Sequence, residues 1–417
     1  MMEVSPARHD SAYWRSYGDA WRWPAAALAA GFALGFALLV WTDARRIVPD
    51  EVGLGVETWA QPASYLGRRI NAWRLEDYST VYDIEAPASS GEVLWVGNSQ
   101  LHAINQLNRK RDQVAPFHAS SALGQPVYCL SLPNANVQEH LATLHWAMTR
   151  RPVRYLVLPM VFDKLRNDGL RPGFERLASP ALSARLATRP QGKRLEGELA
   201  DLQRAAKATG TGTNSQTPLA QLSMSAVLHE VSLQEVSERA LEDGLASRWG
   251  LWQRRPLLWS TVLNDAYVFR NWLLGIKATS KRPMLPVPFE NNMAAFDELL
   301  DVAAAEGIAV LVYIAPIRQD VEPPYIMAEY RPWKAAVARN IAGRQAKGGA
   351  KLAFADLDQL VPAGLWGTAD DSHDIDFMHF QGKGHEILGG KVAQLLQDLG
   401  VGAPAQAGTN ANAVVGR

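Results

Sequence analysis

The sequence has almost no cysteine and no excess of charge of either sign. Cys129 is the only cysteine among 417 residues, so the chain cannot form an internal disulfide. Its position in the apolar run 127–132 predicts a small buried residue rather than a reactive thiol. Lysine plus arginine and aspartate plus glutamate number 42 each, which removes any argument from bulk charge for nucleic-acid binding. We therefore expect no nucleic-acid partner.

One stretch near the N-terminus lacks charge altogether. Residues 23–41 contain no charged or strongly polar side chain, and their length suits the apolar core of a bilayer. Tryptophan at each end is typical of the membrane–water interface. A cleaved signal peptide is the alternative, but no small-residue cleavage site follows. We expect a cytoplasmic segment at 1–23 and a transmembrane anchor at 24–41, although arginines on both sides leave the orientation open.

Beyond the anchor, short apolar runs alternate with longer amphipathic segments. Near-continuous apolar strands separated by helices indicate a parallel sheet covered on both faces. The last predicted helix carries leucine and valine at the spacing of one helical face. We predict an α/β domain over 91–400 with a doubly wound, five-stranded parallel sheet. Its strands are expected at 93–96, 127–132, 153–161, 308–315 and 351–357.

Three segments depart from this alternation. Residues 42–90 suggest a helical stalk that packs onto the domain, and 401–417 suggest a disordered tail. Residues 165–290 are helical in pattern and form a predicted insertion between the third and fourth strands. We expect this insertion to cap the site. The alternative is that it forms a docking surface for a membrane partner. Four tryptophans in this insertion either stack on sugar rings or fill a small core. They are Trp249, Trp252, Trp259 and Trp272.

A serine follows the first predicted strand in the stretch VLWVGNSQLH, residues 93–102. A Gly-Asn pair turns the chain and Ser99 opens a possible helix, where free N–H groups favour negative charge. This placement would expose the hydroxyl of an acyl-transfer nucleophile. It equally suits a serine that only caps the helix.

An acidic residue and a histidine lie three apart just before the last helix, as Asp376 and His379. This spacing lets the carboxylate hydrogen-bond one imidazole nitrogen and leave the other free, which is the base half of a Ser-His-Asp triad. A metal site is the alternative, but no recognised zinc spacing supports it, and we expect neither a metal nor a cofactor. The ligands of such a metal site would be His373, Asp374, Asp376, His379 and His385. Two other histidines, His140 and His145, are expected to have surface or packing roles.

These two motifs resemble those of the SGNH/GDSL hydrolases. Gly97-Asn98-Ser99 is similar to the nucleophile turn of that family, and Asp376-x-x-His379 to its last block. The chain looks most like the membrane-anchored branch that includes DltD and the alginate acetylation proteins. The resemblance covers about 91–400 and implies a flavodoxin-like sheet, an exported catalytic domain and a membrane-bound O-acyltransferase partner.

The chain also departs from the family pattern. Asn98 replaces the usual aspartate, and the third block, G-x-N-D, is absent after 153–161. The resemblance implies an oxyanion hole formed by the N–H groups of Ser99 and Asn134, where the second block normally has glycine. Arg318, at the end of the fourth predicted strand, either binds an anionic group of the substrate or pairs with a neighbouring carboxylate.

Two functions follow as expectations. The first is a serine acyltransferase or esterase, anchored in the bacterial inner membrane by one span with its catalytic domain in the periplasm. Ser99 would be the nucleophile, His379 the base and Asp376 its orienting acid, and the enzyme would modify an exported envelope polysaccharide or glycopolymer together with a membrane-bound O-acyltransferase. The alternative is a non-catalytic polysaccharide-binding or assembly factor of such an acylation complex.

Overall fold

The computed structural model describes most of the chain after residue 57. The described residues are 30–31, 33–35, 58–82, 93–106, 112–208, 273, 280–348, 351–368 and 375–402. The described residues from 58 onward belong to one compact unit. Within the described ranges no helix combines the length and apolar composition that a membrane span requires, and most of the predicted anchor at 24–41 lies outside these ranges.

A six-stranded parallel sheet forms the centre of the unit. Its order is β10-β9-β8-β5-β7-β4, and every pairing between neighbours is parallel. Leaving out β4, the chain order of these strands is 2-1-3-4-5, as in flavodoxin-like folds. The strands are β4 (Asn71–Ala72), β5 (Val93–Gly97), β7 (Val127–Ser131), β8 (Tyr155–Met160), β9 (Ala309–Ile314) and β10 (Leu352–Asp356).

The five predicted strands are all confirmed, but the predicted number of strands is wrong. Each apolar run forms one of the strands β5 and β7 to β10. Strands β5, β7, β8 and β9 are almost fully buried, and strands buried on both faces need apolar residues at successive positions. Strand β10, at the sheet edge, is only partly buried. The sixth strand, β4, has two residues and pairs with β7 at the sheet edge. Two residues are too few for an apolar pattern, so the sequence did not indicate this strand.

Small antiparallel pairs complete the β structure. β1 pairs with β6, β2 with β3, and β11 with β12. The last pair matters for the site, because β12 carries both members of the D-x-x-H motif. The strands are β1 (Thr58–Ala60), β2 (Ser64–Tyr65), β3 (Arg68–Arg69), β6 (Ala103–Asn105), β11 (Trp366–Thr368) and β12 (Ile375–Phe380).

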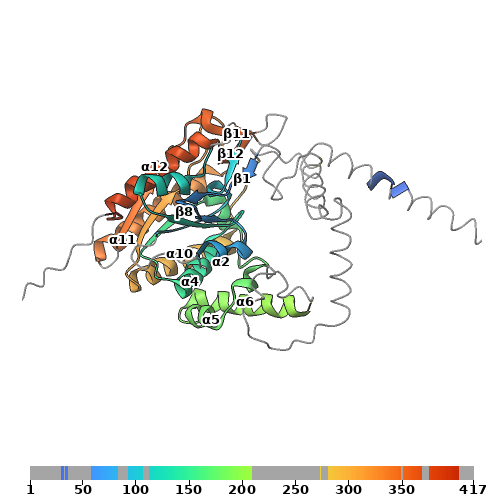
Figure 1. Ribbon diagram of the computed structural model, residues 1–417, viewed down its shortest axis with the longest axis vertical. Helices are drawn as coiled ribbons and strands as arrows, with labels where there is room; N and C mark the ends of the chain where they lie inside the picture. The colour runs from blue at the N-terminus through green and yellow to red at the C-terminus, as the bar shows by residue number, and fades with distance from the viewer. Residues whose placement is uncertain are drawn as a thin grey trace, which may run out of the picture. The chain divides into compact units, whose positions relative to one another are not determined.

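Helices cover both faces of the sheet, so the described fold is doubly wound as predicted. On one face α3 (Ala115–Leu123) and α12 (Gly382–Asp398) enclose an apolar core. On the other face a larger core contains side chains of α4 (Val137–Arg150), α10 (Pro286–Ala305) and α11 (Met327–Lys347). Figure 1 shows α12 on one side of the sheet and α4 and α10 on the other.

The described part of the insertion is largely helical, as predicted, and the cap over the site stays a prediction. Its helices α5 (Pro180–Leu186) and α6 (Pro190–Ala208) contact α4 and each other, and α6 also contacts α10. In Figure 1 they form an outer layer beyond α4. Their buried leucines join the larger core. Residues 209–272 lie outside the described residues. They include about half of the predicted insertion and all four of its tryptophans, of which Trp272 is the last.

Two predicted boundaries are wrong. Residues 58–82, expected within a helical stalk, contain β1 to β4, the short turn η1 (Leu75–Asp77) and α2 (Tyr78–Tyr82). Tyr78 and Tyr82 of α2 pack on Trp146 in the larger core, so the domain begins well before residue 91. At the other end Val401, assigned to the disordered tail, is buried. The rest of the predicted tail, from 403, is not described.

Close packing of α12 on α3 positions the segment that leads into α12. Gly389 of α12 lies against the Ala115 carbonyl and the His118 side chain, and a Cβ at Gly389 would fall 2.7 Å from the His118 Cβ. Gly390, the next residue, has no atom within 4 Å of the corresponding position.

These neighbouring glycines give a matched test of the contact. We expect Gly389→Ala to lower the free energy of unfolding by about 1–3 kcal/mol, because the two helices must separate. Gly390→Ala should raise it by about 0.4–1 kcal/mol through a less flexible unfolded chain. Urea unfolding of the two variants measures both. Equal effects of the two substitutions would contradict this account of the packing.

Candidate active site

The serine lies in a tight turn at the carboxyl end of β5. Gly97 ends the strand, and a Cβ there would collide with the side chain of Leu101, which folds back over the turn. Ser99 then starts the 3-10 turn η2 (Ser99–Leu101). Because β5 lies between β7 and β8 in the sheet, Ser99 sits at the point where the strand order reverses, where α/β sheets bind ligands.

Asn98, and not Ser99, caps this turn. The Asn98 side chain accepts a hydrogen bond from the Gln100 N–H at 3.0 Å. An amide oxygen does this as well as the aspartate oxygen of the family pattern. The alternative role for Ser99, as a simple N-cap, is therefore filled by its neighbour. The hydroxyl is less exposed than we expected, since Ser99 has only 5% of its surface open to solvent.

The D-x-x-H motif lies on β12 rather than on a free turn. In a regular strand, residues three apart point to opposite faces. The β11–β12 register shifts irregularly here, and Asp376 Oδ1 accepts hydrogen bonds from the N–H groups of Met378 at 2.7 Å and His379 at 3.0 Å. This local turn brings the carboxylate and the imidazole onto the same side.

The structure brings Ser99, His379 and Asp376 together in one hydrogen-bonded chain. The Ser99 Oγ lies 2.9 Å from His379 Nε2, and His379 Nδ1 lies 2.8 Å from Asp376 Oδ2. A carboxylate only accepts, so Nδ1 carries the proton and Nε2 is the acceptor that faces the serine hydroxyl. All three residues are buried. This order of nucleophile, base and orienting acid is the one that acyl transfer requires.

The Asp376 carboxylate is kept ionised despite its burial. Burial alone would raise its pKa, but His379 and the N–H groups of Met378 and His379 outweigh that effect and lower the pKa. A further donor is Asn105 at the end of β6, whose Nδ2 lies 3.1 Å from Asp376 Oδ2 and 2.7 Å from Thr58 Oγ1. The chain of polar contacts thus runs from β1 through β6 to the serine.

Arg318 binds the backbone of β11, next to Asn105. It forms a two-point ion pair with Asp320 and donates a hydrogen bond to the Gly367 carbonyl at 2.8 Å. Gly367 lies against the Asn105 side chain so closely that a Cβ could not fit. Of the two alternatives for Arg318, the carboxylate partner is the one present, and the role in substrate binding stays a prediction.

The two predicted oxyanion donors, the N–H groups of Ser99 and Asn134, differ in their surroundings. The Ser99 N–H, first in its turn, makes no hydrogen bond to any described residue and is free to act as a donor. Asn134 adopts a left-handed conformation with φ 56° beyond β7. Its side chain accepts from Lys164 Nζ and its carbonyl from Asn167 Nδ2, and no hydrogen bond joins it to Ser99, His379 or Asp376 among the described residues. Its part in an oxyanion hole stays a prediction.

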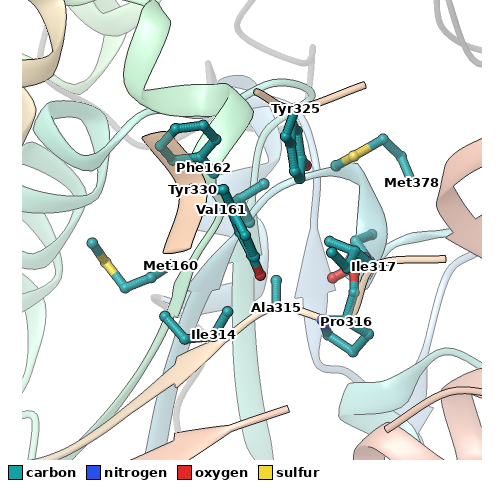
Figure 2. A pocket seen from close by; sticks show the side chains of 11 residues that line it. Met160, Val161, Phe162, Ile314, Ala315, Pro316, Ile317, Tyr325, Tyr330 and Met378 are labelled. Carbon is teal, nitrogen blue, oxygen red and sulfur yellow. Dashed lines mark hydrogen bonds between the residues drawn. The ribbon is translucent and has the colours of Figure 1, made fainter. Parts of the chain in front are cut away.

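A mostly apolar cavity of about 10 Å³ has room for about one water molecule. Gln100 and Met378, the chain neighbours of Ser99 and His379, both line it. Figure 2 shows Tyr325 and Tyr330 beside Phe162, with Met378 facing them across the cavity.

The other histidines that the sequence brought into question have structural roles. His385 Nδ1 accepts from the Ala115 N–H and its Nε2 donates to the Ala103 carbonyl, so neither nitrogen is free for a metal. Three or more metal-ligating side chains gather nowhere in the described part of the chain, and His373 and Asp374 lie outside it. His140 and His145 are buried in α4, which confirms packing over a surface role.

Neither Asn105 nor Thr58 was anticipated from the sequence. Asn105 follows the nucleophile turn by six residues with no motif around it, and Thr58 lies in the segment that we expected to be a helical stalk. Neither a known family model nor a curated protein matches this chain.

Buried neutral histidines make stability depend on pH. Burial lowers the pKa of His385 to about 3 and that of His145 to about 4. In the unfolded chain a histidine binds a proton below about pH 6.5, whereas these buried histidines stay neutral in the folded protein until the pH is much lower. Between these two pH values the unfolded state therefore binds more protons than the folded state. We expect the free energy of unfolding to fall as the pH drops from 7 to 4.5, by up to about 1.4 kcal/mol per pH unit for each such histidine.

The substitution His145→Leu measures how much one of these histidines contributes to the loss of stability in acid. Both ring nitrogens of His145 are buried and make no hydrogen bond to any described residue, so an apolar side chain should preserve or raise stability at pH 7.5. Urea unfolding at pH 7.5 and pH 5 should then show a smaller acid loss in the variant. An unchanged loss would mean that His145 does not contribute.

Proposed function

We propose that this protein is a serine acyltransferase or esterase in which Ser99, His379 and Asp376 act as nucleophile, base and orienting acid. The observation that carries the proposal is the unbroken chain from Ser99 Oγ through His379 to Asp376 Oδ2. Its position at the strand-order reversal and the free Ser99 N–H add support. From the family resemblance we extend the proposal to a membrane-anchored enzyme that modifies an exported glycopolymer beside a membrane-bound O-acyltransferase.

The residues suggest the following steps. As Ser99 Oγ attacks the acyl carbonyl, its proton passes to His379 Nε2, and Asp376 stabilises the imidazolium through Nδ1–H. The Ser99 N–H donates to the oxyanion. His379 then gives the proton to the leaving oxygen, and the acyl group stays on Ser99. An acceptor hydroxyl or water, deprotonated by His379, takes the acyl group and restores the serine.

A non-catalytic assembly factor remains the second candidate. The low exposure of the triad favours it, because Ser99, Asp376 and His379 are 5%, 7% and 6% exposed. A binding protein has no need, however, of an imidazole held between a serine and an ionised carboxylate.

Ser99→Ala separates the two functions. We expect the variant to lose labelling by a fluorophosphonate probe and to hydrolyse p-nitrophenyl acetate at least about 10³-fold more slowly, because the attacking oxygen is gone. The fold should persist, since Asn98 supplies the cap, and the loss of the buried hydrogen bond to His379 should lower the free energy of unfolding by about 1 kcal/mol. Ser121→Ala, an exposed serine on α3, is the control and should retain both activities. Labelling that survives in Ser99→Ala would contradict the proposal.

Asn105→Ala tests the positioning of the acid. Loss of a hydrogen bond to a charged group should slow ester hydrolysis by about tenfold or more. It should also move the acidic limb of the pH–rate profile to higher pH, because an Asp376 carboxylate without this donor is protonated more readily. Thr58→Val, which removes the other partner of Asn105, should cause a smaller change in the same direction. A rate loss with an unmoved profile would indicate only structural damage.

A further inference from the structure

A polar cavity of about 310 Å³ opens at the same edge of the sheet as the triad. This volume is in the range of small-ligand sites. Its walls come from the loop after β7, the turn η3 (Phe162–Arg166) after β8, and the residues that return from the insertion. The lining residues are Asn134, Asp163, Lys164, Arg166, Asn167, Arg282 and Leu285.

The sheet order places this cavity beside the nucleophile. Asn134 follows β7 and Lys164 follows β8, and β5, which leads to Ser99, lies between these two strands. Lys164 Nζ donates to Asn134 Oδ1 at 2.6 Å, so this contact bridges the strands on either side of β5. The cavity therefore adjoins the carboxyl end of the strand that carries the serine turn.

Cations outnumber anions in the cavity wall. Lys164 Nζ and Arg282 Nη1 lie 3.3 Å and 3.0 Å from Asp163 Oδ2, and Arg166 Nη1 lies 3.9 Å from Oδ1. Burial would raise the pKa of Asp163, but Lys164, Arg282 and Arg166 lower it, so the carboxylate is ionised. One carboxylate facing three cations leaves a local excess of positive charge.

Two polar atoms of this wall lack a hydrogen bond to any described residue. Asp163 Oδ1 and Arg166 Nε are buried and make no hydrogen bond within the described part of the chain, and Asp163 is 9% exposed. Buried polar groups nearly always have partners, so these atoms point to a missing one. The first accepts and the second donates, which suits a ligand that carries both a hydroxyl and an anionic oxygen.

We propose that the cavity binds a hydroxylated anion, a carboxylate or phosphate group flanked by a hydroxyl, and that this is one unit of the molecule that accepts the acyl group. The role as acceptor rests on the proposed function, whereas the binding of the anion does not. The anionic oxygens contact Arg166 and Arg282, and a hydroxyl donates to Asp163 Oδ1.

The test uses D-glucuronate and glucose 6-phosphate as probes, with methyl glucoside as the neutral control. Titration calorimetry of the full chain at low ionic strength should detect binding of at least one of the two anions and none of the neutral sugar. The preferred anion identifies carboxylate or phosphate as the recognised group. Added sodium chloride should weaken the binding, because the attraction is partly screened. Equal binding of methyl glucoside, or binding of neither anion, overturns the site.

Variants then assign the binding to this cavity. Arg166→Gln and Arg282→Gln should each weaken the anion by about tenfold or more, because each removes a charged donor. Arg204→Gln, an exposed arginine of α6 that pairs with Asp201, is the matched control and should bind as the wild type does. Thermal unfolding checks that the variants are folded. Unchanged affinity in both cavity variants would place the anion elsewhere and refute the assignment.

Fluorophosphonate labelling in the same preparation keeps the two proposals apart. Anion binding without labelling of Ser99 would refute the enzymatic function and leave the binding site standing. Labelling without anion binding would refute the binding site alone.

Discussion

The hydrogen bond between Ser99 Oγ and His379 Nε2 joins two segments 280 residues apart, and the arrangement around both residues serves to align them. On one side, Gly97 and the Asn98 cap fix the turn after β5. On the other, Gly389 lets α12 approach α3 and so places β12. Because a hydrogen bond weakens within a few tenths of an ångström, both elements must be held rigidly. Rigid packing is thus a condition of the site.

The two polar regions at this sheet edge differ in how completely their hydrogen bonds are made. Around Asp376 both carboxylate oxygens have donors, from backbone N–H groups, His379 and Asn105. A satisfied network of this kind is stiff. Around Asp163, three cations form ion pairs with the carboxylate, but Oδ1 accepts no hydrogen bond from any described residue. The region around Asp376 therefore has the features of a preorganised site, and the region around Asp163 has polar groups that a ligand could satisfy.

The sequence allowed the central sheet to be predicted because each buried strand is a continuous apolar run that any window can detect. It did not allow β4 to be predicted, since two residues form no pattern and pairing with β7 depends on distant contacts. The same limit applied to the site. Ser99 and the D-x-x-H spacing are local signals, whereas Asn105 reaches Asp376 across 271 positions. The alternative in which Ser99 only caps the turn also needed the fold, because the hydrogen bond from the Gln100 N–H to the Asn98 side chain shows that Asn98 is the cap.

The low exposure of the triad bears on which acceptor resolves an acyl-enzyme. Ser99 and His379 are 5% and 6% exposed, and the mostly apolar cavity lined by their chain neighbours has room for about one water molecule. Little water can therefore occupy this small cavity. The polar cavity at the end of β5 is far larger and offers both donors and acceptors. If the hydroxylated ligand proposed above binds there, it lies at the same sheet edge as the serine, and its hydroxyl then meets the acyl group at a higher effective concentration than free water does. Under the proposed function, this asymmetry favours transfer of the acyl group over hydrolysis.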